Sequence, residues 1–254
     1  MDLLSSLFRW IHVGAGVLWI GHLYFFNFVN ASFAGTMDGE TKRKVVPELM
    51  PRALYMFRYG ALTTWITGVA LLFIVYYHGG LMYSAESGKE WTEMNSLITI
   101  ALILVGTVLY DVLAKTPLTK NLPLTGIVGL AIIAGVTYLL INFGGFDYRA
   151  YNIHIGALFG TIMAFNVWNR IWPSQKKIIK AVKEGTPPDP ALVALAGLRS
   201  KHNTYLSVPL LWTMINAHTA VPASDSWWYL IGIVAAGWGL AALLYKKAAT
   251  VKGF

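Results

Sequence analysis

The chain has 254 residues, of which 56% are hydrophobic and 13% charged, with a formal net charge of +8 and no cysteine. The absence of cysteine excludes disulfides, thiolate metal sites, iron–sulfur clusters and covalently attached c-type haem within this chain. The basic residues fall between long apolar runs, where the membrane charge rule accounts for them, so we expect no nucleic-acid partner.

The apolar runs predict an all-α fold, a polytopic transmembrane helix bundle of about seven spans, because a bilayer-spanning helix needs about 20 apolar residues. The runs do not alternate polar and apolar residues, as the strands of a membrane β-barrel would. No small-residue cleavage site follows the first run, so we expect it to be a retained helix. One domain over residues 1–254 is expected, with spans at 5–29, 54–78, 95–114, 122–143, 151–172, 203–221 and 227–246.

Lysine and arginine are concentrated in alternate loops. The first, third and fifth loops and the C-terminal tail are rich in both, whereas the second and fourth loops hold only Lys89 and Arg149 and the sixth holds neither. The positive-inside rule therefore predicts that the N-terminus is outside and the C-terminus is cytoplasmic. The fifth loop, at about 174–201, contains a Gly-Thr-Pro-Pro break between two helix-like stretches and is expected to lie on the cytoplasmic surface.

Three histidines share one predicted depth. His12 and His154 begin the first and fifth spans from outside, and His218 ends the sixth span on its way out. At about 1.5 Å per residue, all three lie within roughly 3–8 Å of the outer hydrocarbon boundary. Haem b requires two imidazoles from different helices facing one cleft, so two of the three are predicted iron ligands. Arg9 and Arg149, at the same level, are candidates to pair with the haem propionates.

A second polar group is predicted at the cytoplasmic edge. His202 and Asn203 open the sixth span, and Arg58 lies in the inner part of the second span, where its charge suits an anionic substrate. The alternatives are a helix-start cap for His202 and snorkelling to the membrane surface for Arg58. His202 and His218 are separated by a rotation of about 160° and cannot hold two haems stacked on one helix face, so one haem is expected, with a second as the alternative.

Longer motifs surround these residues. They are His12…Gly16…Trp19-Ile20-Gly21…Tyr24-Phe25, His154-Ile155-Gly156-Ala157 with Gly160-Thr161-Ile162-Met163 and Asn166-Val167, Pro173-Ser174-Gln175, and His202-Asn203-Thr204-Tyr205 with Pro209 and His218. In these motifs, which span nearly the whole chain, the sequence resembles the membrane domain of membrane-bound urate hydroxylases (PuuD-type urate oxidases). Thr204 departs from the family pattern, which has an asparagine there.

The resemblance implies a bacterial inner-membrane oxidoreductase that hydroxylates urate to 5-hydroxyisourate and passes electrons to cytochrome c. Family members commonly carry a C-terminal cytochrome c domain, whereas this chain has no Cys-x-x-Cys-His, so the expected acceptor is a separate cytochrome c. One alternative is a non-catalytic, haem-bearing electron-transfer or scaffolding subunit of a larger respiratory complex. Another is a transporter, which the near absence of acidic residues within the spans disfavours.

Overall fold

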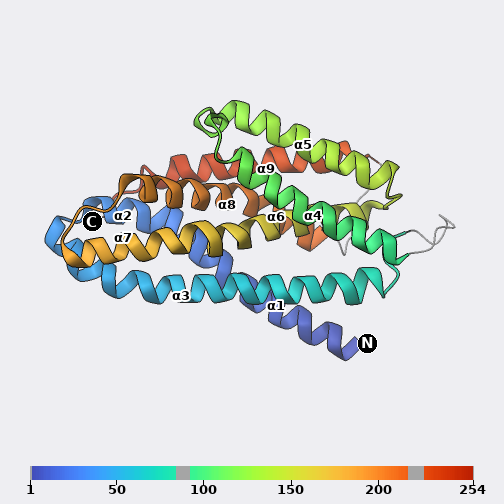
Figure 1. The fold of residues 1–254 in the computed structure, drawn as a ribbon, viewed down its shortest axis with the longest axis horizontal. Helices are drawn as coiled ribbons and strands as arrows, with labels where there is room; N and C mark the ends of the chain where they lie inside the picture. Colours follow the sequence, from blue (N-terminus) through green and yellow to red (C-terminus); the bar gives the residue numbers. More distant parts are fainter. Residues whose placement is uncertain (1, 84–91, 217–225, 254) are drawn as a thin grey trace.

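The computed structural model describes residues 2–83, 92–216 and 226–253, and these ranges contain helices and no strand. Most helices run along the long axis of the molecule, with the two chain termini at opposite ends (Figure 1). The α-helices are α1 Asp2–Tyr24, α2 Ala31–Thr36, α3 Gly39–Leu71, α4 Glu93–Leu113, α5 Leu122–Asn142, α6 Tyr148–Asn166, α7 Trp172–Glu184, α8 Pro190–Asn216 and α9 Trp228–Ala248. The all-α prediction is confirmed.

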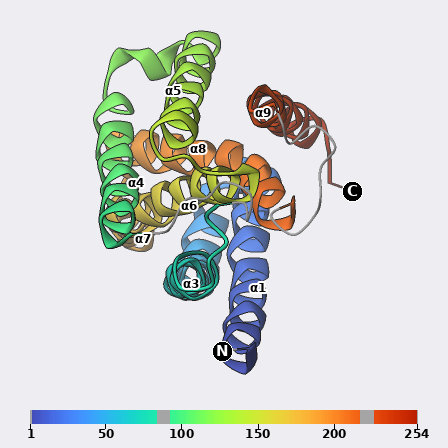
Figure 2. The ribbon, with the colours of Figure 1, turned by 90° about the vertical axis from the view of Figure 1, so that its right-hand side faces the viewer.

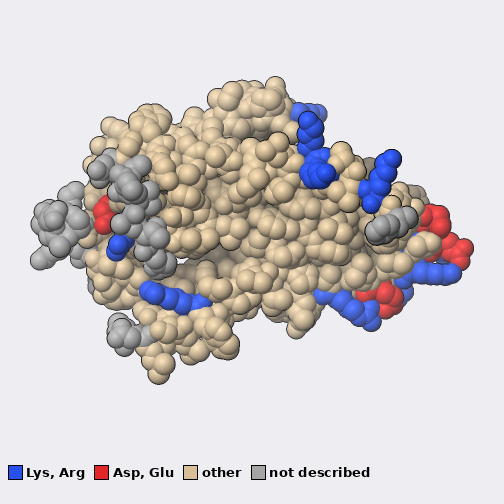
Figure 3. Space-filling view, turned by 180° about the vertical axis from the view of Figure 1, so that it is seen from behind, with Lys and Arg blue, Asp and Glu red and all other residues tan. Residues whose placement is uncertain are grey.

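Five of the helical segments are long and apolar enough to cross a membrane. On the face shown in Figure 3, the charged side chains gather toward the two ends and leave an uncharged belt between them. This distribution is the one that a bilayer requires, because its hydrocarbon core solvates apolar side chains and excludes charges. The five segments are Leu3–Thr36, Gly39–Tyr77, Met94–Leu113, Leu122–Asn142 and Trp228–Ala248.

Helices α6 and α8 are not among these five apolar segments, although the sequence predicts spans there. Seen end on, they lie at the centre of the bundle, with the other long helices around them (Figure 2). More than half of the residues of α6 are buried, and α8 buries polar residues such as Arg199 and Asn203. A helix that faces protein instead of lipid can carry polar side chains. The count of seven spans therefore stays a prediction, and the two additional spans would be the central ones.

The predicted loop between the first two spans is largely helical. Helix α1 continues through a π-helical turn, η1 (Phe25–Asn30), into α2, and α3 begins at Gly39. The side chain of Asp38 caps α3 by accepting a hydrogen bond from the Thr41 N–H at 2.8 Å. A second π-helical turn, η2 (Leu72–Tyr77), ends the long helix that α3 starts.

Residues 174–201 differ from the surface loop that the sequence predicts. The expected break is present at Gly185, which ends α7 in the left-handed conformation at φ 73°. Beyond it, α8 runs unbroken from Pro190 to Asn216 and joins the predicted short surface helix to the predicted sixth span. Ala196 and Arg199 are 2% and 0% exposed, so this half of the segment belongs to the bundle. Residues 217–221 of that span lie outside the described residues.

The basic segments meet at one end of the molecule. The turn after α7 lies against the start of α3, because a Cβ added to Gly185 would be 2.8 Å from Cζ of Arg43. Near the end of α4, Asp111 contacts Arg170 and Arg199. The C-terminus lies at the same end (Figure 1). The basic loops and the C-terminal tail thus lie at one end of the molecule. The charge rule predicts that this end faces the cytoplasm.

Helices α1 and α3 approach closely through Gly60. A Cβ at that position would lie 3.1 Å from the backbone nitrogen of Trp19 and 3.3 Å from the carbonyl oxygen of Ala15. Further along the antiparallel pair, the ring of His12 lies against Gly68. Backbone atoms cannot rotate away as a side chain can, so glycine at position 60 sets the distance between the two helices.

We expect Gly60→Ala to destabilise the protein by about 1–3 kcal/mol, because the added methyl group forces α1 away from α3. Gly21→Ala is the matched control, since a Cβ there meets nothing within 4 Å. Thermal unfolding in detergent measures both. Equal melting temperatures for the two variants would contradict the close packing at Gly60.

Candidate functional site

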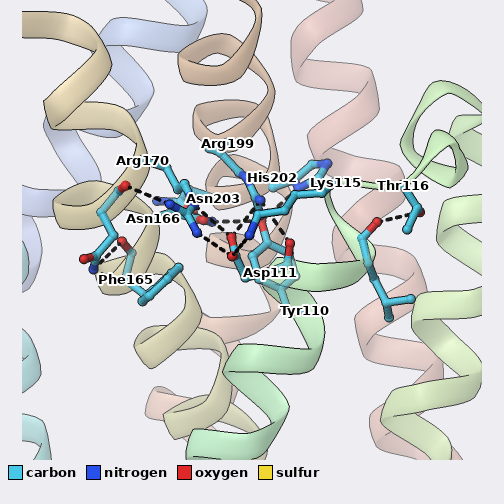
Figure 4. A network of polar contacts seen from close by, with 12 residues as sticks. Tyr110, Asp111, Lys115, Thr116, Phe165, Asn166, Arg170, Arg199, His202 and Asn203 are labelled. Atoms are coloured by element: carbon cyan, nitrogen blue, oxygen red, sulfur yellow. Dashed lines mark hydrogen bonds and ion pairs between the residues drawn. The ribbon is translucent and has the colours of Figure 1, made fainter. Parts of the chain in front are cut away.

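A cluster of charged side chains joins α4, the turn that follows α6, and α8 at the basic end of the bundle (Figure 4). Asp111 of α4 accepts hydrogen bonds from Nε of Arg170 at 2.9 Å and from Nη2 of Arg199 at 2.8 Å. Nζ of Lys115 lies 2.7 Å from the same carboxylate. Three cations thus share one anion, and the cluster carries an excess of positive charge.

Arg199 is the most deeply buried member of this cluster. Its side chain is 0% exposed, and its Nη2 also approaches the backbone oxygen of Asp111 at 3.3 Å. Its Nε and Nη1 have no hydrogen-bond partner in the described structure. Buried donors in native proteins are almost always paired with protein, water or a ligand. These two nitrogens are therefore candidate donors to a bound acceptor.

A layer of uncharged polar groups adjoins the ionic cluster. Nδ2 of Asn166 donates to the Tyr110 oxygen and to Oδ1 of Asn203, both at 2.8 Å. The Tyr110 oxygen also lies 2.8 Å from Nδ1 of His202. The Tyr110 oxygen thus joins Asn166 of α6 to His202 of α8. Oδ1 of Asn166 is buried without a partner.

The local shape of α6 aims these side chains. A π-helical turn, η5 (Val167–Ile171), follows Asn166 and contains Arg170. The extra residue in a π turn changes the direction of the side chains that follow it, and such turns are frequent at functional sites. Here it lets Asn166 face α8 while Arg170 reaches Asp111 on α4.

His202 and Asn203 are brought together with Asn166 and Tyr110, whereas Arg58 has other partners. Its guanidinium carbon lies 3.6 Å from the ring centroid of Trp172, and its Nε donates to the carbonyl oxygen of Leu54. The cation that lies near His202 is Arg199. The sequence interpretation placed Arg199 in a surface loop, although its position three residues before His202 puts both on one side of a helix.

At the opposite end of α6, His154 is enclosed by aromatic rings. It is 1% exposed, its ring is stacked on Tyr77 at a centroid distance of 5.8 Å, and Phe146 lies 5.1 Å away. Its Nδ1 lies 2.6 Å from the Ala150 carbonyl oxygen, which can only accept, so Nδ1 carries the proton. The lone pair is therefore on Nε2, which the Tyr77 hydroxyl contacts at 3.1 Å.

This geometry fits one axial position of a haem. Metal-bound histidines commonly donate their second N–H to a backbone carbonyl, which fixes the ring and frees the other nitrogen for the metal. Arg9 and Arg149 are both exposed and lie close enough to Tyr76 to interact with it electrostatically. Tyr76 in turn lies 6.5 Å from His154 between ring centroids. Arg9 and Arg149 thus act on the aromatic residue beside His154, and their pairing with haem propionates stays a prediction.

His12 and His154 contact different turns of the long helix formed by α3 and η2. Its Nδ1 lies 3.1 Å from Oγ1 of Thr67, ten positions before the Tyr77 that contacts His154. His218 lies outside the described residues. Within the described ranges no group of three or more histidine, aspartate or glutamate side chains is arranged to hold a metal ion. Which histidine would hold a haem together with His154 therefore stays a prediction.

An all-α bundle with an uncharged outer belt and polar central helices defines a membrane-type helical protein built around an internal site. The family model described as Urate oxidase N-terminal matches residues 1–250. The chain therefore belongs to this family. The match confirms the resemblance to urate oxidase membrane domains that the sequence motifs indicate. No curated protein and no solved structure matches the chain significantly.

The ionic cluster generates a stability prediction. We expect Asp111→Asn to destabilise the protein by about 3–5 kcal/mol, because it leaves the buried Arg199 without a counter-charge. Glu48→Gln is the control, since Glu48 pairs with Arg52 at the same end but is 72% exposed. Urea unfolding in detergent measures both variants. A destabilisation by Asp111→Asn no larger than that by the control would contradict the structural role of Asp111.

Proposed function

We propose that this protein is the membrane-embedded part of an oxidoreductase that converts urate to 5-hydroxyisourate. The balanced half-reaction is urate plus water to 5-hydroxyisourate, two protons and two electrons. Family membership supports the substrate. The proposed position of the substrate site depends on one observation. Arg199 is fully buried and has unpaired N–H groups, and it lies beside His202 and Asn203.

The chemistry of this cluster suits urate. Urate is a planar purine anion whose edge alternates N–H donors with oxygen acceptors. Arg199 offers a positive charge and two free donors, and Asn166 offers a free acceptor. A buried site whose polar groups match such an edge discriminates strongly against molecules that leave those groups unpaired. His202, hydrogen-bonded to Tyr110, is the titratable group placed to move a proton.

In this proposal one haem b would be held toward the outer face by His154 together with His12 or His218. The Tyr77 hydroxyl would then give up its hydrogen bond to His154 Nε2, and Arg9 and Arg149, which act electrostatically on the neighbouring Tyr76, would pair with the propionates. When bound, the haem supplies one-electron transfer. The acceptor is a separate cytochrome c at the outer surface of a bacterial inner membrane, alone or within a larger respiratory complex.

Urate oxidation is tested by visible spectroscopy of the purified protein. We expect anaerobic urate to reduce the haem, and we expect His202→Ala and Asn203→Ala to slow this reduction at least about tenfold, a loss typical of removing an acid–base or positioning group. His22→Ala is the control, because that imidazole bonds only its own helix at the Leu18 carbonyl. Haem absorption bands that do not change on urate addition would instead favour a non-catalytic, haem-bearing subunit.

Haem ligation is tested separately from turnover. We expect His154→Ala to lose most of the haem, since Nδ1 of His154 donates to the Ala150 carbonyl oxygen and leaves Nε2 as the nitrogen that could bind iron. Tyr77→Phe should retain haem, because it removes only the hydroxyl that competes for Nε2. The exposed His78 provides the control variant His78→Ala. A pyridine haemochrome assay measures haem content, and full haem in His154→Ala would exclude His154 as a ligand.

A further inference from the structure

We propose that the anionic substrate reaches Arg199 from the basic end of the bundle, the predicted cytoplasmic end, by passing Lys115 and Arg170. This inference rests on the proposed function, and it adds the side of the membrane from which the site is filled and the residues that guide the anion.

The cations of the cluster form a graded series from solvent to interior. The side chain of Lys115 is 57% exposed, that of Arg170 is 27% exposed and that of Arg199 is 0% exposed. All three contact Asp111, so they lie within a few ångströms of one another. A row of like charges leading into a low-dielectric interior concentrates counter-ions at its mouth and lowers the cost of bringing an anion inside.

A purely structural role accounts for only part of this arrangement. One carboxylate needs one buried cation for neutrality, whereas Asp111 has three cationic partners. Asp111 engages Arg199 through Nη2 and leaves Nε and Nη1 unpaired at full burial. Leaving buried donors unpaired is costly, so the arrangement is expected to persist because a second anion completes it. Asp111 then acts as a positioning residue that holds Arg199 in place.

The opposite end offers no comparable route in the described ranges. There the rings of Tyr76 and Tyr77 are 5% and 4% exposed, and the Met82 side chain is 0% exposed. Arg9 and Arg149 lie at the surface of that end, and no buried arginine or lysine lies behind them in the described part of the chain. An anion arriving from that side would meet packed aromatic and apolar groups, which offer it no compensation for lost water.

The side of entry is tested with sealed membrane vesicles. Inverted vesicles, with the cytoplasmic face outward, should show urate-dependent haem reduction at once, whereas right-side-out vesicles should show it only after permeabilisation with detergent. Reduction of equal rate in intact right-side-out vesicles would overturn the proposed route. No reduction even in detergent would overturn the proposed function itself, and this inference with it.

The guiding residues are tested by substitution. We expect Lys115→Gln and Arg170→Gln each to raise KM for urate about 3–10-fold at low ionic strength with little change in kcat, and we expect the difference to shrink in high salt. Arg52→Gln is the matched control, a cation at the same end that is 74% exposed and paired only locally with Glu48. Lys115 is on the surface, so its variant remains informative if Arg170→Gln folds poorly. An unchanged KM for Lys115→Gln, or an equal change for Arg52→Gln, would contradict the proposal.

Discussion

The contact of one carboxylate with three cations fixes the arrangement of the inner half of this bundle. An isolated charge in the bundle interior is costly, so the contact between Asp111 and Arg199 compensates both side chains for the loss of water. Their pairing connects α4 with α8, and Arg170 adds the turn that follows α6. With these elements fixed, Asn166 and Asn203 meet at hydrogen-bond distance and His202 is held against Tyr110. The candidate substrate site is thus a consequence of an electrostatic constraint that lies beside it.

In the described residues, three π-helical turns direct polar groups into the interior of the bundle. The turn η1 contains Asn27, which donates to Ser200 of α8 and accepts from Tyr245 of α9. The turn η2 ends at Tyr77, the partner of His154, and η5 contains Arg170, the partner of Asp111. An α-helix with an apolar stripe presents the same face to its neighbours along its length. The extra residue of a π turn rotates the side chains that follow it, so a different face meets the neighbours beyond the turn. Long membrane-type helices can therefore deliver single polar contacts to the core while the rest of their surface stays apolar.

Much of the fold could be predicted from the sequence, because apolar runs of bilayer length identify helices without reference to their neighbours. The polar pair His202 and Asn203 was also predicted as a candidate site, since both stand at the start of such a run. Arg199 was not: an arginine near a lysine-rich loop reads as solvated, and its burial depends on a contact with Asp111 that is 88 positions away in the chain. The neighbours of His12 were equally hidden, because depth along a helix says nothing about which way the helix is turned. The helix that begins at Gly39 has a local signal in its Asp38 cap, whereas its packing against α7 is recorded in no local pattern.

Helix α6 links the two ends of the proposed chemistry. His154 and Asn166 are twelve positions apart on it, about 18 Å along the axis at 1.5 Å per residue. Twelve steps of about 100° also turn the two side chains to different sides of the helix, so His154 meets Tyr77 of η2 while Asn166 meets α4 and α8. A helix can serve two such sites only if protein covers it on all sides, and α6 is buried over more than half of its residues. The central position of α6 therefore allows it to carry polar residues, although these keep it out of the set of apolar spans. The two sites require those polar residues.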